Sequence, residues 1–122
     1  MKYSRFPFLR SFQYAFEGVK YALITQRNIK IHFMIASIVS ILAIWLKLSS
    51  IEWGILILTI TSVIVSELFN TSLEKILDSL SVERNNTSKI AKDISAAAVL
   101  FTAIASAIIG TILFLPKLLA KI

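Results

Sequence analysis

The sequence contains no cysteine among its 122 residues, which excludes disulfide bonds, thiolate metal sites and cysteine nucleophiles. Glycine is also scarce, with only Gly18, Gly54 and Gly110. A Walker A loop or a kinase glycine-rich loop needs several glycines within a few residues, so this sequence has neither. Any phosphate group that the protein handles must be bound by side chains and metal ions instead.

Charged residues are few as well, at 16%, whereas soluble domains carry about 25%. Hydrophobic residues make up 57%, and the mean hydropathy is +0.79. A soluble domain of this size has too much surface for its volume to bury so many apolar side chains. The excess indicates contact with lipid or with partner subunits. The net charge of +6 therefore favours an anionic membrane surface over nucleic acid as the partner.

Three apolar runs approach or exceed the ~20 residues that a helix needs to span a bilayer. The clearest extends from Ile94 to Leu115 without one charge. The second is uncharged from Trp53 until Glu67, and its helical pattern continues to Asp78. The fold class is therefore predicted to be an all-α membrane protein forming a single domain. Its expected parts are a surface helix at 1–28, transmembrane segments at 29–48, 51–78 and 89–115, a cytoplasmic loop at 79–88 and a C-terminal tail at 116–122.

The surface helix is predicted from an amphipathic pattern, in which large apolar side chains recur at helical spacing opposite polar ones. The apolar set is Phe8, Phe12, Phe16, Val19 and Leu23, and the polar set is Arg10, Gln13, Glu17 and Lys20. Such a helix is expected to lie among lipid headgroups, the alternative being a surface helix packed on a protein core. Lys and Arg are concentrated in residues 2–30 and 75–92, so the positive-inside rule places the N-terminus and the loop in the cytoplasm and the C-terminus outside.

Four polar residues of the second run form an acidic stripe: Glu67, Asn70, Glu74 and Asp78. Their offsets of 0, 3, 7 and 11 place all four on one side of a helix. Carboxylates at membrane depth are costly and usually mark a functional site, while Glu74 and Asp78 could also be solvated residues of a helix end. Three carboxylates on one stripe repel one another unless a cation lies among them or one is protonated.

A second polar cluster, Lys92-Asp93, opens the third apolar run and precedes Ser95 and three alanines. It is expected at the same membrane level as Glu74 and Asp78. A lysine facing several carboxylates would suit a polyphosphate with its metal ion, although a simple charge-balancing set remains the alternative. His32 stands near the start of the first run, where packing or hydrogen bonding is the usual role of a lone histidine, and the sequence shows no catalytic partner for it.

The sequence resembles the prokaryotic diacylglycerol kinase family, which includes the undecaprenol kinases. The resemblance rests on two segments. One is ELFNTSLE, from Glu67 to Glu74, with Asp78 four residues later, which together contain the acidic stripe. The other is Ala91-Lys92-Asp93 with the alanine-rich helix that follows. It extends over nearly the whole chain. Further matching positions are Arg10-Ser-Phe, Gly18, Arg27-Asn28, His32 and Phe114-Leu-Pro-Lys117. The Ile51-Glu52-Trp53 segment and the Phe-Leu-Pro-Lys ending look more like the undecaprenol kinase branch.

The resemblance implies an ATP-dependent lipid kinase that phosphorylates the hydroxyl of a membrane lipid alcohol, with undecaprenol favoured and diacylglycerol next. It implies Mg²⁺ as cofactor and a homotrimer in the bacterial cytoplasmic (inner) membrane, with active sites shared between subunits at the cytoplasmic boundary. No nucleic-acid partner is expected. The rival hypothesis is a non-catalytic small membrane subunit or an ion-conducting oligomer, and a catalytically inactive relative is a third.

The resemblance also assigns roles to individual residues. Glu67 matches the general base, and Glu67, Asn70 and Ser95 match lipid-binding positions. Glu74 and Gln26 match the metal ligands. The nucleotide-binding positions are Arg10, Tyr14, Gln26, Glu74, Glu83, Arg84, Asn85, Lys92 and Asp93. Gln26 is a departure, because the family often has a glutamate there; its amide oxygen can still bind Mg²⁺, but without the charge. Asp78 is the other carboxylate that could take this role, and Arg5 is the alternative to Arg10.

Overall fold

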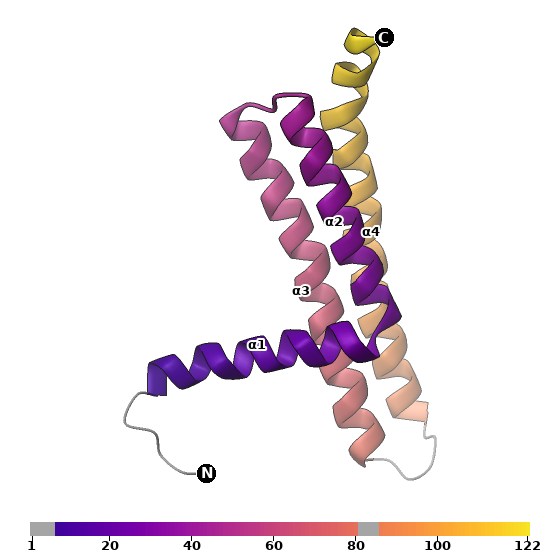
Figure 1. The fold of residues 1–122 in the computed structure, drawn as a ribbon. Coiled ribbons are helices and arrows are strands. Elements are labelled where there is room, and N and C mark those ends of the chain that lie inside the picture. The colour runs from indigo at the N-terminus through magenta and orange to yellow at the C-terminus, as the bar shows by residue number, and fades with distance from the viewer. Residues whose placement is uncertain (1–6, 81–85) are drawn as a thin grey trace.

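The computed structural model describes residues 7–80 and 86–122, and within these ranges the chain is helical with no strand. The helices are α1 (Pro7–Thr25), α2 (Arg27–Trp45), α3 (Ser50–Leu80) and α4 (Asn86–Lys121). Figure 1 shows α2, α3 and α4 side by side as a bundle, with α1 lying across it. Each of the three bundle helices is long and apolar enough to cross a membrane. The predicted all-α membrane fold with a separate N-terminal helix is confirmed.

Two of the bundle helices are longer than a bilayer requires. At ~1.5 Å per residue, the 31 residues of α3 and the 36 residues of α4 extend for about 46 and 54 Å. The hydrocarbon core of a bilayer is only ~30 Å thick. Figure 1 shows that α3 and α4 continue past α1, on the side away from the α2–α3 turn. Glu74, Asp78 and Lys92 lie at or near this protruding end.

The helix ends differ from the expected boundaries. The segment expected as a loop at 79–88 is partly helical, because α3 continues to Leu80 and α4 begins at Asn86. The segment expected as a tail at 116–122 is also helical, since α4 passes through Pro116 and ends at Lys121. Residues after the proline are good helix formers, and two of them are held by neighbours. Lys117 Nζ lies 3.2 Å from Glu52 Oε1, and Lys121 Nζ lies 4.7 Å from the centre of the Trp45 ring.

The α2–α3 turn is closed by a Schellman motif. Leu48 N–H donates to Ala43 O and Lys47 N–H to Ile44 O, both at 3.2 Å, which satisfies carbonyls that the helix end would leave unpaired. Lys47 takes the left-handed conformation, with φ of 56°, that this motif needs. Helix α3 then begins with a capping box, because Ser49 Oγ accepts from Glu52 N–H at 3.2 Å and Glu52 Oε1 accepts from Ser49 N–H at 3.1 Å. The turn therefore fixes α2 and α3 as antiparallel neighbours.

The apolar core lies at the end of the bundle near this turn. Its buried members are Ala43, Leu46, Leu48, Leu56, Leu113 and Phe114. Most other large apolar side chains on the three bundle helices remain exposed, Ile41 and Leu58 among them. Such a surface would be unfavourable in water and is the one expected of helices that face lipid or other subunits.

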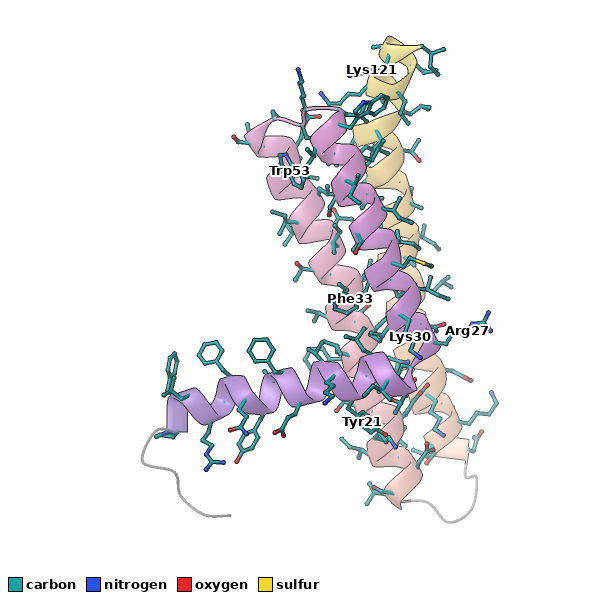
Figure 2. The ribbon with its side chains drawn as sticks, viewed as in Figure 1. Tyr21, Arg27, Lys30, Phe33, Trp53 and Lys121 are labelled. Carbon is teal, nitrogen blue, oxygen red and sulfur yellow. The ribbon has the colours of Figure 1, made fainter. Side chains whose placement is uncertain are left out.

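Helix α1 touches the bundle only through its C-terminal part. Ala22 is its one buried residue, and residues 7–18 are all exposed. Figure 2 shows aromatic rings along the side of α1 that faces the length of the bundle, and side chains with nitrogen and oxygen atoms along the other. Lys75 Nζ lies 5.1 Å from the centre of the Tyr21 ring, a cation–π contact that joins α1 to α3. This helix is therefore placed to rest in the membrane surface with its rings toward the acyl chains.

Candidate active site

The acidic stripe becomes steadily more exposed from the middle of α3 toward its end. Glu67 is buried, with 3% of its surface exposed. Asn70 and Glu74 are half-buried, and Asp78 is exposed. The four residues lie on one side of α3, as their spacing predicts. A carboxylate as buried as that of Glu67 is rare unless it is paired, which sets it apart from an ordinary helix-end residue.

His32 of α2 is the partner of Glu67. Its Nε2 lies 3.2 Å from Glu67 Oε1, and the His32 side chain is 22% exposed. The sequence alone shows no partner for this histidine. A usable signal was present, because His32 and Glu67 lie a similar number of helical turns before and after the α2–α3 turn, and antiparallel neighbours bring such positions together.

Asn70 and Glu74 form the middle of the stripe. Asn70 Nδ2 donates to Glu74 Oε1 across one helical turn at 3.5 Å. Asn70 Oδ1 is buried and has no hydrogen-bond partner among the described residues. A buried unpaired carbonyl oxygen is unfavourable. It is therefore a candidate acceptor for a substrate hydroxyl or a bound water, next to the carboxylate of Glu74.

The outer end of the stripe is joined to α4 by an ion pair. Lys92 Nζ lies 2.6 Å from Asp78 Oδ1, which confirms that Lys92 reaches the level of the stripe. Asp93 behaves differently, since its Oδ2 lies 2.7 Å from Nζ of Lys89 on the same helix. Lys92 is thus paired with a residue of α3, and Asp93 with a lysine of its own helix. Deeper in the bundle, Ser66 Oγ and Thr102 Oγ1 form another α3–α4 hydrogen bond of 2.9 Å.

Two of the other predicted site residues, both on α1, lie apart from the stripe. Arg10 and Tyr14 lie on the exposed part of α1, which projects away from the bundle in Figure 1. Gln26 lies at the α1–α2 junction, where its Nε2 donates to Thr25 Oγ1 at 3.4 Å. Ser95 is half-buried on α4. The predicted nucleotide contacts Glu83, Arg84 and Asn85 lie outside the described residues.

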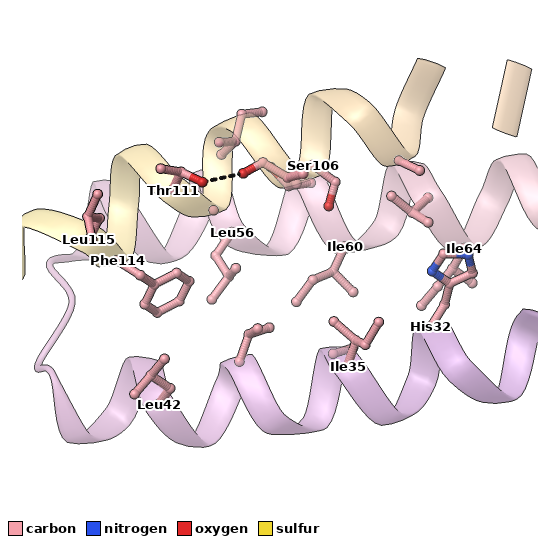
Figure 3. A pocket seen from close by; sticks show the side chains of 18 of the residues that line it. His32, Ile35, Leu42, Leu56, Ile60, Ile64, Ser106, Thr111, Phe114 and Leu115 are labelled. Atoms are coloured by element: carbon pink, nitrogen blue, oxygen red, sulfur yellow. Dashed lines mark hydrogen bonds between the residues drawn. The ribbon is translucent and has the colours of Figure 1, made fainter. Parts of the chain in front are cut away.

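A mostly apolar cavity of about 570 Å³ lies between α2, α3 and α4. Figure 3 shows His32 and Ile64 at one end of the cavity, Ile60 nearer its middle and Leu115 at the other end. The cavity runs along the part of the bundle that is suited to the membrane interior. It therefore joins an apolar space to a histidine that contacts the buried carboxylate of Glu67.

The carboxylates are distributed unevenly between the two ends of the bundle. Glu74, Asp78 and Asp93 lie at or near the protruding end of α3 and α4, whereas Glu52 is the one acidic residue at the end with the α2–α3 turn. Across the described ranges, no group of three or more His, Asp and Glu side chains is close enough to enclose a metal ion. A cation at the stripe would therefore take its remaining ligands from amide oxygens, waters or a bound molecule such as a polyphosphate.

Comparison with known proteins identifies the family of this chain. Residues 13–114 match the family model described as prokaryotic diacylglycerol kinase. The chain is 44% identical over 113 residues to a diacylglycerol kinase of Synechocystis, covering 92% of this chain and 65% of that relative, so it spans just under two thirds of the relative's length. It is 39% identical over 111 residues to the undecaprenol kinase of Bacillus subtilis, covering 91% and 90% of the two chains. It is 28% identical to a diacylglycerol kinase of Escherichia coli, covering 82% of each. The resemblance found in the sequence is therefore confirmed: this three-span protein belongs to the prokaryotic diacylglycerol kinase family.

Proposed function

We propose that the protein transfers the γ-phosphoryl group of ATP to the hydroxyl of a membrane lipid alcohol, with undecaprenol favoured over diacylglycerol. The observation that carries the proposal is the buried carboxylate of Glu67, which contacts His32 at the end of an apolar cavity. Glu67 also shares one side of α3 with the more exposed Glu74 and Asp78. A lipid alcohol has an apolar tail and a polar reacting group, and this arrangement matches both. The kinase names of the family members support the reaction.

Glu67 is the proposed general base. The lipid hydroxyl oxygen attacks the γ-phosphorus, the bond from this phosphorus to the β–γ bridging oxygen breaks, and ADP leaves. The hydroxyl proton passes to the Glu67 carboxylate. Asn70 and Ser95 are the other proposed lipid contacts. The unpaired Oδ1 of Asn70 supports its assignment, because it can accept a hydrogen bond from the hydroxyl and hold it near Glu67.

Lys92 is the proposed phosphate-binding cation. Phosphoryl transfer depends mainly on positioning and on neutralising the charge of the phosphate oxygens. Lys92 is already held at the level of the stripe by Asp78, so a short movement of its flexible side chain would transfer it to a phosphate. Asp93, Glu83, Arg84 and Asn85 complete the proposed nucleotide contacts of this part of the chain.

Mg²⁺ is the proposed cofactor, held by Glu74 and Gln26. Mg²⁺ is commonly bound through one or two carboxylates together with substrate phosphates and waters. The half-buried Glu74 carboxylate fits this mode, because its one described hydrogen bond is a long one of 3.5 Å from an amide. The ion would supply positive charge against the β- and γ-phosphate oxygens. The neutral amide of Gln26 would bind it more weakly than a carboxylate.

A homotrimer with shared sites is the proposed assembly. Arg10 and Tyr14 lie on the exposed part of α1, away from the stripe of their own subunit. A neighbouring subunit could use them, because α1 projects outward from the bundle. The protein is proposed to reside in the bacterial cytoplasmic membrane. The charged end of α3 and α4 and the N-terminus would face the cytoplasm, and the C-terminus would face outward.

The experiment is a phosphorylation assay with purified protein, γ-labelled ATP and Mg²⁺ in mixed micelles, with undecaprenol and diacylglycerol supplied separately and in competition. We expect label in lipid phosphate, with undecaprenol preferred, and loss of activity in Glu67→Gln. Glu52→Gln is the matched control, because it makes the same change on the same helix at the opposite end of the bundle. Full activity in Glu67→Gln would remove Glu67 from this role, and absence of labelled lipid with the unmodified protein would contradict the proposal.

A further inference from the structure

The carboxylate of Glu67 has one hydrogen-bonding side chain among the described residues, and that side chain is His32. Glu67 Oε1 lies 3.2 Å from His32 Nε2, and only 4% of the Glu67 side chain is exposed. A buried carboxylate without a partner is strongly unfavourable. The pair therefore determines where the carboxylate lies inside the bundle.

A glutamate side chain has several rotatable bonds, so burial alone does not orient its two oxygens. A hydrogen bond to Oε1 restricts the orientation of the group, and among the described residues Oε2 has no side-chain hydrogen bond. A general base must come within about 2.6–3.2 Å of the atom whose proton it removes. A displacement of ~1 Å in such a site can lower the rate by a factor of about 10². The orientation of the Glu67 carboxylate is therefore a requirement for catalysis.

We infer that His32 is a positioning residue for phosphoryl transfer: its Nε2–H donates to Glu67 Oε1 and holds Oε2 ready for the proton of the lipid hydroxyl. The inference rests on the proposed role of Glu67 as the base. The location of His32 supports it, because His32 also lines the end of the apolar cavity (Figure 3). The histidine thus touches both the space suited to the lipid and the group suited to take its proton.

The competing explanation is that the His32–Glu67 contact only holds α2 and α3 together. The structure contains a matched contact of that kind. Ser66 Oγ and Thr102 Oγ1 are 2.9 Å apart and join α3 to α4 at the residue next to Glu67. Loss of this hydrogen bond weakens helix packing at the same level of the bundle without removing a donor to Glu67. Thr102→Val is therefore the control for a purely structural effect.

The first experiment compares His32→Leu, His32→Gln and Thr102→Val in the micelle assay, with kcat and KM determined for ATP and lipid. We expect His32→Leu to lower kcat by about 10- to 100-fold, with KM for ATP changed less than about twofold, as the ~10² effect of small misplacements suggests. His32→Gln retains an N–H donor, so we expect it to recover kcat to within about fivefold of the unmodified protein. Thr102→Val should stay within about twofold.

Three outcomes would overturn the inference: unchanged kcat in His32→Leu, an equal loss in His32→Gln, or an equal loss in Thr102→Val. The result for Glu67→Gln separates the two proposals. If Glu67→Gln is inactive and His32→Leu is fully active, then the role of His32 fails and the proposed base remains. If Glu67→Gln is fully active, the base itself is wrong.

The second experiment needs no His32 variant, so it does not depend on whether one folds. The sequence contains a single histidine, so its ring signals in a ¹⁵N NMR spectrum are unambiguous. We expect Nε2 to be protonated in the unmodified protein. We expect its signal to shift in Glu67→Gln and to remain in place in Glu52→Gln. An unprotonated Nε2, or a signal that ignores Glu67→Gln, would contradict the donation on which the inference depends.

Discussion

Lys92 Nζ lies 2.6 Å from Asp78 Oδ1, so the lysine that would bind phosphate is already held by a carboxylate of another helix. The pair joins the protruding ends of α3 and α4. Both side chains are substantially exposed, at 40% for Lys92 and 64% for Asp78. Exposed pairs of this kind contribute only about 0.2–1 kcal/mol. The contact therefore orients Lys92 without binding it too tightly for a nucleotide to capture.

Removal of the Asp78 charge tests this relationship. In Asp78→Asn, Lys92 no longer has to leave an ion pair, so we expect KM for ATP to fall by up to about fivefold, the equivalent of the ~1 kcal/mol upper limit for an exposed pair. Steady-state kinetics at saturating Mg²⁺ and lipid would measure this. The alternative role of Asp78 as a metal ligand leads to the opposite result, because the Mg²⁺ concentration for half-maximal activity would then rise. Glu52→Gln is a suitable comparison, since it removes the acid of another ion pair, with Lys117, at the opposite end of the bundle.

Gln26 can be replaced by glutamate, the residue that the family often has at this position. We expect Gln26→Glu to lower the Mg²⁺ concentration needed for half-maximal activity by several-fold, because a carboxylate adds charge to the oxygen ligand. Titration of activity with Mg²⁺ at fixed ATP gives the value. Gln13→Glu, on the exposed part of α1, adds the same charge elsewhere. An equal response in both variants would mean that the added charge acts non-specifically.

Filling the cavity should impair lipid binding and leave nucleotide binding intact. Gly110 lines the cavity, and a Cβ atom added there meets no atom within 4 Å. We expect Gly110→Leu to raise KM for the lipid by about tenfold or more, because the new side chain occupies space proposed for the tail, while KM for ATP stays within about twofold. Gly54→Leu is the control, since Gly54 also faces open space but is not among the residues that line the cavity.

The left-handed conformation of Lys47 makes a prediction about stability. An L-residue with a φ of 56° is disfavoured by roughly 1 kcal/mol or more relative to its usual conformation, whereas glycine adopts it freely. We expect Lys47→Gly to raise the free energy of unfolding by up to about 1 kcal/mol and Lys47→Val to lower it. Denaturation in micelles followed by circular dichroism would show the order. Equal stabilities of the three proteins would contradict the left-handed conformation at position 47.

The helices of this protein, and the residues that share a face of each, could be predicted from hydropathy and residue spacing. The apolar runs predicted the three long helices because a bilayer demands both length and hydropathy. The one-sided placement of Glu67, Asn70, Glu74 and Asp78 followed from the 3.6-residue repeat alone. The amphipathic pattern of residues 8–23 was likewise sufficient for α1. The ends of α3 and α4 were harder to predict from the sequence. The polar residues after Leu77 and the proline at position 116 are each compatible with either a loop or a continued helix.

Contacts between helices depended on tertiary structure. The pairing of His32 with Glu67 required the register of the α2–α3 hairpin, which the Schellman motif and capping box determine. The choice of Lys92 over Asp93 as the neighbour of Asp78 depended on the rotation of α4 about its axis. Sequence spacing specifies which residues share one face of a helix, but only packing against the other helices decides what that face meets. For this protein, the sequence was enough to locate the carboxylates on one helix face. Only the folded bundle showed that Glu67 contacts His32 and that Asp78 contacts Lys92.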